Sequence, residues 1–368
     1  MDRDEFSAWL RLLETPGVGR DSARALLSRF GSPQAALDAS VDARKSAVGA
    51  GPALALSTPP PEFEPRLAAA WHWLQGASDG EIRDAIAIGD PRYPAPLLET
   101  ADPPLLIYVR GRPELLASPS LAIVGSRNPT AQGLENARAF AAHLGQAGWV
   151  IVSGLALGID GAAHEGALEA GGTTIAVVGT GLDRVYPARH RALAQRIAGQ
   201  GLLVSEFAIG TPALPPHFPV RNRIIAGLTR GTLVVEAALN SGSLITARMA
   251  AEAGREVFAI PGSIHSPQSR GCHLLIKQGA KLVDKASDIL EELPASRSSV
   301  GGAGDAPGKP AATDPLLESL GYDPMSLDEL IARTGRSAAD LSARLLDLEL
   351  QGRVARRPGQ MFQRIERG

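Results

Sequence analysis

The chain has 368 residues, of which 44% are hydrophobic and 21% are charged, and its formal net charge at pH 7 is −2. Because a single hydrophobic core rarely grows beyond about 250 to 300 residues, this length predicts two or three domains. The composition is that of a globular protein, and apolar runs such as TLVVEAAL are far too short to cross a bilayer, which excludes an integral membrane protein. The single cysteine, Cys272, excludes a disulfide framework and a cysteine-rich metal site, and we expect it to be a packing residue.

Residues 1–75 are predicted to form a helical domain. The first residues, MDRDEFSAWLRLLE, carry acids and none of the succession of an export signal, so we expect a cytoplasmic protein. The stretch ETPGVGRDSARALLSRFGS follows a helix, tight turn, helix pattern, in which Gly17 and Gly19 flank Val18 and a second helix begins at Arg20. This stretch resembles the helix-hairpin-helix motif, which grips nucleic-acid backbones without reading their sequence; a compact turn between packed helices is the alternative.

Residues 76–293 are predicted to form a sheet domain. A proline-rich connector, DPRYPAPLLETADPP, leads into the strand-like LLIYVRG, after which short β-branched runs alternate with helical stretches. The runs are LAIVGS, WVIVSG, TTIAVVG, GLLVSEF, TLVVEA, EVFAIPG and AKLVD. The helical stretches are Gly133–Ala147, Gly158–Ala170, Ala188–Ala198, Val220–Thr229, Leu244–Ala253 and Gly271–Gln278. This alternation predicts an α/β fold, a Rossmann-like doubly wound and mostly parallel sheet with helices on both faces.

The remainder of the chain is predicted to be a linker and a winged helix. Residues 294–314, PASRSSVGGAGDAPGKPAATD, have the composition of a flexible linker. Residues 315–368 follow the order helix, turn at Gly335, helix, and two-strand ribbon around RRPGQ. The helix that would enter a major groove carries Asp340, Asp347 and Glu349 beside Arg344, so the pattern favours a partner-binding or regulatory role over tight duplex binding.

The loops that follow the predicted strands point to an anion-binding crevice. In a doubly wound sheet, ligands bind outside the carboxyl ends of the strands. The loops expected there are rich in Gly, Ser, Thr and Asn: GSRNPT, SGLALGID, GTGLD, SEF and NSGSLITA. Their amides, hydroxyls and helix N-termini would attract an anion, and Arg127, Arg221 and Arg223 would add full charges. Seven arginines against two acids between Leu182 and Gly231 indicate a local basic patch.

The same loops lack the signatures of a cofactor site or a catalytic site. The glycines of VGSRNPTAQG have the wrong spacing for a dinucleotide, Ser153 stands where an acidic residue would hold a ribose, and a Walker lysine is absent, so no cofactor is predicted. The loop carboxylates are scattered, and no His/Cys cluster has metal-ligand spacing. Asp160 and Glu236 are interpreted as partners of nearby arginines rather than as catalytic groups. The isolated histidines, His164, His217 and His265, are interpreted as structural.

An arginine-lined crevice without catalytic groups suits a repeating anion such as single-stranded nucleic acid. Aromatic residues make up only 4% of the chain, so base stacking should fall to few side chains. Phe218 is the best placed of these, and Tyr186 and Phe207 are further candidates. We therefore expect phosphate contacts to dominate binding and affinity to fall as salt rises.

Six ordered motifs carry a resemblance to a known family: AIVGSRNPT, SGLALGID, GTGLD, HFPVRNRIIAGLT, VVEAALNSGSLITA and REVFAIPG closely resemble the DNA-processing protein A (DprA/Smf) family, from about Asp90 to Leu290. The resemblance implies a non-enzymatic protein that binds single-stranded DNA and forms a homodimer through its Rossmann-like domain. It also implies the loading of RecA recombinase onto DNA that single-strand-binding protein would otherwise cover, during natural transformation. The DNA pocket implied by the resemblance is lined by Ser126, Arg127, Phe218, Arg221, Asn222, Arg223, Ser241, Gly242 and Ser243. The crevice loops add Gly125, Ser153, Gly154 and Asn240 to the expected DNA contacts.

The alternative is an enzyme on the related fold of cytokinin-activating phosphoribohydrolases. Those enzymes hold a nucleotide phosphate with a glycine-rich loop, PGGxGTxxE, whose glutamate lies on the following helix and performs the chemistry. The corresponding text here is NSGSLITARMAAE, which lacks the glycine pair and in which Glu252 comes too late to match. This alternative predicts that the protein releases adenine from AMP, whereas the DNA-binding hypothesis does not.

Overall fold

The structure, a computed structural model, describes residues 1–77, 81–293, 315–320, 325–350, 353–357 and 361–364. It divides into two compact units, Met1–Ala295 and Ser296–Gly368. The predicted linker, 294–314, lies outside the described residues. None of the helices in the described ranges combines the length and the apolar character that a membrane-spanning segment needs.

The first unit begins with a helical subdomain, which comprises the helices of residues 3–75. Asp2 starts the first helix by accepting a hydrogen bond from the amide of Glu5 at 2.9 Å, and Gly31 ends the second in the left-handed conformation. Aromatic and aliphatic side chains such as Phe6, Trp9 and Leu26 form its core. The helices are α1 (Arg3–Glu14), α2 (Arg20–Phe30), α3 (Pro33–Asp38), α4 (Val41–Val48), α5 (Ala50–Ala55) and α6 (Phe63–Gln75).

A nine-stranded sheet forms the centre of the first unit, in the order β1-β2-β6-β5-β4-β3-β7-β8-β9. Along this order each strand from β6 to β9 is parallel to the next, whereas β2 runs antiparallel to both β1 and β6. Each of the predicted strand-like runs forms a strand. The strands are β1 (Arg83–Ala87), β2 (Leu106–Gly111), β3 (Ser120–Val124), β4 (Val150–Ser153), β5 (Thr174–Val177), β6 (Leu202–Ser205), β7 (Gly231–Val234), β8 (Glu256–Ala259) and β9 (Lys281–Leu282).

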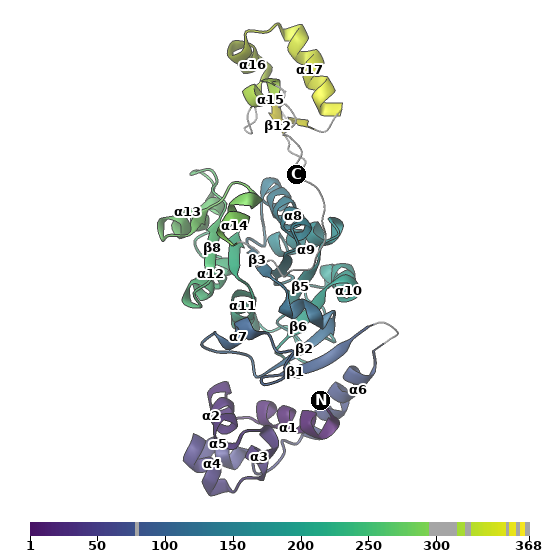
Figure 1. Cartoon of the computed structure of the whole chain (residues 1–368), viewed down its shortest axis with the longest axis vertical. Coiled ribbons are helices and arrows are strands. Elements are labelled where there is room, and N and C mark those ends of the chain that lie inside the picture. Colours follow the sequence, from purple (N-terminus) through teal and green to yellow (C-terminus); the bar gives the residue numbers. More distant parts are fainter. Residues whose placement is uncertain (78–80, 294–314, 321–324, 351–352, 358–360, 365–368) are drawn as a thin grey trace, which may run out of the picture. The chain divides into compact units, whose positions relative to one another are not determined.

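Helices cover both faces of the sheet, as the alternation of strands and helices predicts (Figure 1). The side chains of β3 divide between two hydrophobic clusters: Leu121 and Ile123 pack with α8, α9 and α14, while Ala122 and Val124 pack with α11, α12 and α13. Cys272 is buried in the second cluster, where burial raises the pKa of its thiol to about 12, as expected of a packing residue. The helices are α7 (Ala95–Leu98), α8 (Ala131–Gln146), α9 (Ile159–Glu169), α10 (Arg191–Gln200), α11 (His217–Leu228), α12 (Gly242–Glu252), α13 (Arg270–Lys277) and α14 (Ala286–Glu292).

The strand order reverses direction at β3. From β3 the chain adds β4, β5 and β6 on one side of the sheet, then returns to place β7 on the other side. The loops that leave β3 and β7 therefore diverge at the carboxyl ends of two neighbouring strands. In a doubly wound sheet such a divergence opens the crevice in which ligands bind.

The second unit has the winged-helix order that the sequence predicts. Ser326 and Glu329 form a capping box at the start of α16, and Gly335 ends that helix with a φ of +67°. Leu330, Leu341 and Phe362 contribute to its own hydrophobic core. Its elements are α15 (Pro315–Leu320), β10 (Met325–Ser326), α16 (Leu327–Thr334), α17 (Ala338–Leu350), β11 (Val354–Arg357) and β12 (Met361–Arg364), with the sheet order β10-β12-β11.

Candidate nucleic-acid interface

A cavity of about 470 Å³ lies at the carboxyl ends of β3 and β7, where the strand order reverses. The loop after β3, the start of α9, α11 and the loop into α12 enclose it. Its lining residues are Val124, Gly125, Ser126, Arg127, Asn128, Ala156, Asp160, Phe218, Arg221, Asn222, Ile225, Ala238, Asn240, Ser241, Gly242, Ser243, Thr246 and Gln268. We call this volume the switch-point cavity.

The loop between β3 and α8 forms the first wall of the cavity and is fixed from below. The amide of Ser126 donates to the carbonyl of Glu236 at 2.7 Å, and the carboxylate of Glu236 accepts hydrogen bonds from the amide and hydroxyl of Thr130. Thr130 in turn caps α8. Glu236 therefore anchors the loop. The expectation that it pairs with an arginine is wrong, because none of the ion pairs found among the described residues includes Glu236.

The loop between β4 and α9 packs beneath the first wall. Gly158 has a φ of +83°, and a Cβ at this position would lie 2.3 Å from the carbonyl oxygen of Ser126, so only glycine fits. This close approach lets the amide of Ile159 donate to the same oxygen at 3.2 Å. Leu155 also has a positive φ, which is unusual for a residue with a side chain. The small residues predicted in this loop therefore allow it to pack closely against the β3–α8 loop at the crevice.

The start of α12 forms the opposite wall. The hydroxyl of Ser241 accepts a weak hydrogen bond from the amide of Ser243 at 3.4 Å and lies 2.7 Å from its hydroxyl. The first turn of a helix leaves amide groups without intrahelical partners and carries partial positive charge. Both Ser241 and Ser243 line the cavity. This wall therefore offers neutral donors to an anion.

The floor of the cavity holds a buried arginine and a buried aspartate. Arg221, on α11, is only 4% exposed and donates from one amino nitrogen, Nη1, to the carbonyls of Gly154 at 2.7 Å and Val177. Burial lowers its pKa to about 10, against the opposing charge of Asp160, so the guanidinium remains cationic at neutral pH. The carboxylate of Asp160 accepts hydrogen bonds from the amides of Gly154 and Ala156 at 3.1 and 3.3 Å.

Asp160 has a nearby arginine, Arg221, as its charged neighbour, but the two do not form an ion pair. The ion pairs found in the described part of the chain do not include it; the amides of Gly154 and Ala156 donate to its carboxylate, and the side chain of Ser153 is a further hydrogen-bond partner. Burial raises the pKa of this carboxyl, although the nearby charge of Arg221 and the two amides oppose the rise. Asp160 therefore lies near Arg221 in the same floor. Its charge opposes the fall in the pKa of Arg221, although the carboxylate does not contact the guanidinium.

An aromatic edge borders the mouth of the cavity. The guanidinium of the exposed Arg127 lies 5.7 Å from the ring centroid of Phe218, and the ring of Tyr186 lies 5.5 Å from that of Phe218. Tyr186 is 53% exposed, and it is the one exposed aromatic side chain among the described residues. A side cavity of about 70 Å³ opens between these rings and Arg221. Phe207, the third stacking candidate, instead packs against His217 with ring centroids 4.1 Å apart.

Most of the predicted DNA contacts come together in this cavity. Those that line it are Gly125, Ser126, Arg127, Phe218, Arg221, Asn222, Asn240, Ser241, Gly242 and Ser243. Gly154 borders the side cavity instead. Ser153 is fully buried and donates its hydroxyl to the carbonyl of Ile123 at 2.6 Å, so it holds the sheet together.

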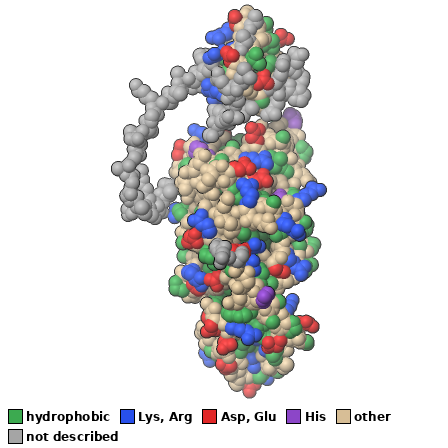
Figure 2. All heavy atoms as spheres, turned by 90° about the vertical axis from the view of Figure 1, so that its right-hand side faces the viewer, with side chains coloured by type: hydrophobic (Ala, Val, Ile, Leu, Met, Phe, Trp, Pro, Cys, Tyr) green, Lys and Arg blue, Asp and Glu red, His purple; other side chains and the backbone are tan. Residues whose placement is uncertain are grey.

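Arg223 does not reach the cavity. Its guanidinium pairs with Asp102 at 2.9 Å and with Glu206. Of the seven clustered arginines, only Arg221 lines the cavity, so the basic run in the sequence does not form a continuous arginine-lined groove. On the face shown in Figure 2, basic and acidic side chains are interspersed rather than separated. The positive charge available to a ligand is therefore local, and Arg127 and Arg221 supply it.

Sequence reasoning missed several lining residues as DNA contacts, of which Asn128, Asp160, Thr246 and Gln268 are polar or charged. Gln268 comes from the segment after β8, and its side-chain amide donates to the carbonyl of Asn128 at 3.1 Å. The signal for Gln268 was the position of β8 next to β7, which brings the loop after β8 to the same edge of the sheet. Among the described residues, no group of three or more His, Cys, Asp or Glu side chains could hold a metal ion.

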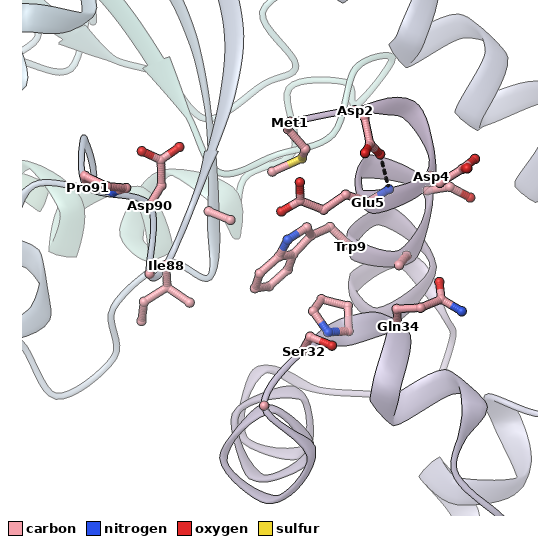
Figure 3. A pocket seen from close by; sticks show the side chains of 16 residues that line it. Met1, Asp2, Asp4, Glu5, Trp9, Ser32, Gln34, Ile88, Asp90 and Pro91 are labelled. Carbon is pink, nitrogen blue, oxygen red and sulfur yellow. Dashed lines mark hydrogen bonds between the residues drawn. The ribbon is translucent and has the colours of Figure 1, made fainter.

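A larger cleft elsewhere in the first unit has the wrong charge for a polyanion. It measures about 940 Å³ and lies between α1, the start of α3 and the segment after β1. Figure 3 shows the carboxylates of Glu5 and Asp90 on opposite sides of the cleft, with the indole of Trp9 on the same side as Glu5. Asp2 and Asp4 add further negative charge to its lining. Phosphates would be repelled there, so this cleft is not a candidate interface for a polyanion.

Comparisons with known proteins agree with this architecture. The family model for DNA recombination-mediator protein A matches residues 84–294. Models for a DprA winged helix domain and a DprA-like N-terminal HHH domain match residues 303–360 and 3–50. Protein Smf of Escherichia coli is 46% identical over 275 residues, which are 73% of this chain and 74% of that protein.

Two solved structures share the fold. The structure of DNA processing protein A from Streptococcus pneumoniae matches with a TM-score of 0.68 and 38% identity over 78% of this chain and 97% of that one. DNA processing protein A from Helicobacter pylori, described for its unique single-stranded DNA binding mode, matches with a TM-score of 0.52 and 30% identity over 57% of this chain and 95% of that one. The resemblance found in the sequence motifs is confirmed: this chain belongs to the DNA recombination-mediator protein A family.

Proposed function

We propose that the chain binds single-stranded DNA in the switch-point cavity and acts as a recombination mediator rather than an enzyme. One observation carries the proposal: the start of α12, the β3–α8 loop, the buried Arg221 and the exposed Arg127 all surround one volume of about 470 Å³. Helix amides, hydroxyls and guanidinium groups are the donors that phosphates take in proteins. A cavity lined by them suits the backbone of a nucleic acid.

The aromatic edge favours a single strand over a duplex. A base can stack on an exposed ring such as Tyr186 only when it is released from its own pair and stack. Tyr186 packs against the ring of Phe218, and Phe218 lies next to the guanidinium of Arg127. The stacking surface is therefore adjacent to the phosphate donors. The Helicobacter pylori relative, whose structure concerns single-stranded DNA binding, supports the same ligand for this chain.

The mediator role rests on the family resemblance. It comprises protection of incoming DNA, loading of RecA where single-strand-binding protein competes, and a homodimer formed by the sheet domain, all in natural transformation. Against the phosphoribohydrolase alternative, Glu252 is the last residue of α12 and does not line the cavity, so it cannot serve the role of the catalytic glutamate in that pattern. RecA filament assembly on DNA covered by single-strand-binding protein tests the mediator role. Released adenine after incubation with AMP would establish the enzyme instead.

The binding site itself is tested by substitution of Arg127. A charge-assisted hydrogen bond contributes about 1.5 to 3 kcal/mol, so Arg127→Ala should weaken the binding of a fluorescent oligo(dT) about tenfold or more. The matched control is Arg138→Ala, which removes an exposed arginine that pairs with Glu165 at 2.8 Å between α8 and α9. An equal loss in the two variants, or none in either, would contradict the proposed site.

A further inference from the structure

Three arginines and two carboxylates link the helical subdomain to α11, the helix that supplies Phe218, Arg221 and Asn222 to the switch-point cavity. We call this set the charge network: Arg20, Arg24, Asp102, Glu206 and Arg223. The helical subdomain provides Arg20 and Arg24 from α2, the segment before β2 provides Asp102, and the residue directly after β6 is Glu206. Neither the sequence motifs nor the site described above explains why these charges gather.

Asp102 lies at the centre of the network. Its carboxylate is 3.0 Å from Arg20, 2.6 Å from Arg24 and 2.9 Å from Arg223. Burial alone would raise the pKa of this carboxyl, but Arg223, Arg24 and Arg20 together hold it below its ordinary range. Arg24 also donates to the carbonyl of Pro103 at 3.2 Å, which fixes the backbone beside the carboxylate.

Glu206 completes the link to α11. It pairs with Arg223 in a contact whose two side chains are only 12% and 13% exposed, and Arg20 lies 3.6 Å from its other oxygen. Partly buried pairs are screened by salt much less than exposed ones. Without the two arginines of α2, the carboxylates of Asp102 and Glu206 would face Arg223 alone.

We propose that Arg20 and Arg24 are positioning residues for the strand-binding cavity: through Asp102 and Glu206 they hold Arg223 in place and so fix the orientation of α11. The inference rests on the proposed function. The helical subdomain thereby supports DNA binding without contacting the strand. Arg223, which does not reach the cavity, takes part as the anchor of the helix whose neighbouring residues, Arg221 and Asn222, do reach it.

The test measures the affinity of the full chain for oligo(dT) over a salt series in the double variant R20Q/R24Q, together with its thermal midpoint. Substitution of residues that position α11 alters the geometry of the cavity, so affinity should fall about twofold to thirtyfold, the range expected of couplings between distant sites. The slope of log affinity against log salt should stay unchanged, because no phosphate contact is lost.

The matched control is R66Q, which breaks the pair of Arg66 with Glu14 inside the helical subdomain and leaves the charge network intact. It should lower the thermal midpoint without lowering affinity. A slope that becomes shallower by about 0.7 per arginine would make Arg20 and Arg24 direct phosphate contacts and overturn the inference. Unchanged affinity in R20Q/R24Q would also overturn it. If the unaltered protein binds no oligo(dT) at all, the proposed function fails instead.

Discussion

The imidazole of His164 is fully buried on α9, where its Nδ1 lies 2.7 Å from the hydroxyl of Thr174. Because that hydroxyl donates to the carbonyl of Ile151 at 2.6 Å, Nδ1 must carry the proton and donate to it. Nε2 has no hydrogen-bond partner among the described residues. A second proton on Nε2 would therefore be buried and unsatisfied, and burial, followed by the charges of His190 and Arg221, lowers the pKa to about 3.

The stability of the first unit should therefore depend on pH through His164. A histidine whose pKa is depressed in the folded state contributes its full stability to that state at pH values above its unfolded pKa, near 6.5. This stability is lost as pH falls toward the pKa of the folded state. The loss approaches about 1.4 kcal/mol per pH unit within that window. In thermal denaturation between pH 7 and pH 4, His164→Leu should show a shallower decline than the unaltered protein. Parallel declines would show that His164 does not set the acid sensitivity.

Tyr186 gives a residue-scale test of base stacking. Loss of one base stack costs about 1 to 3 kcal/mol, so Tyr186→Ala should weaken oligo(dT) binding several-fold or more, while Tyr186→Phe should retain it because the ring remains. Titrations with an oligonucleotide that carries an abasic site separate stacking from phosphate contact. The abasic site should cost affinity in the unaltered protein and cost nothing further in Tyr186→Ala. Equal costs in both proteins would place the base elsewhere.

At the scale of elements, the β3–α8 loop depends on one carboxylate. Glu236 accepts two hydrogen bonds from Thr130, at the point where the loop turns into α8. Because hydrogen bonds to a charged group contribute about 1.5 to 3 kcal/mol, Glu236→Ala should lower the free energy of unfolding by that order and also weaken DNA binding through a loosened Arg127. Urea denaturation and oligo(dT) titration measure the two effects.

The control for Glu236 is Glu169→Ala, an exposed residue at the end of α9 that makes the same change in charge. It should leave both quantities within about 0.5 kcal/mol of the unaltered protein. A Glu236 variant with unchanged stability would mean that the loop is held by other contacts.

The central strands could be predicted from the sequence, because a strand that is buried on both faces has a continuous run of apolar, β-branched residues. The edge strand β1 (RDAIA) was not, because it begins with two charged residues and is otherwise rich in alanine, and aspartate and alanine both have low strand propensity. Its pairing with β2 is set by tertiary structure. Element boundaries shifted by a few residues, as for α11, which begins at His217 rather than at Val220.

The cavity was predictable wherever a residue lies on a loop at the carboxyl end of a strand. Arg223 shows the limit of that reasoning. It lies two residues after Arg221 on α11, which turns its side chain about 200° away around the helix axis. Its partners, Asp102 and Glu206, come from distant parts of the chain, so the sequence alone gave no sign of the charge network.

At the scale of the whole molecule, the switch-point cavity is built entirely from residues of the first compact unit. Deletion of residues 294–368 should therefore leave the affinity for oligo(dT) within about twofold, which corresponds to less than about 0.5 kcal/mol. The second unit has a hydrophobic core of its own, and the clusters of the sheet domain contain none of its residues. A collapse of binding on truncation would make the winged helix the DNA-binding module.

The central claim is that the mouth of the parallel sheet receives a chain of phosphates with unpaired bases. Competition between single-stranded and double-stranded DNA for the protein, repeated over a salt series, tests it most directly. We expect single strands to displace duplex at every salt concentration, with log affinity falling linearly against log salt. Equal affinity for the two forms, or an affinity for single strands that does not change with salt, would contradict the account.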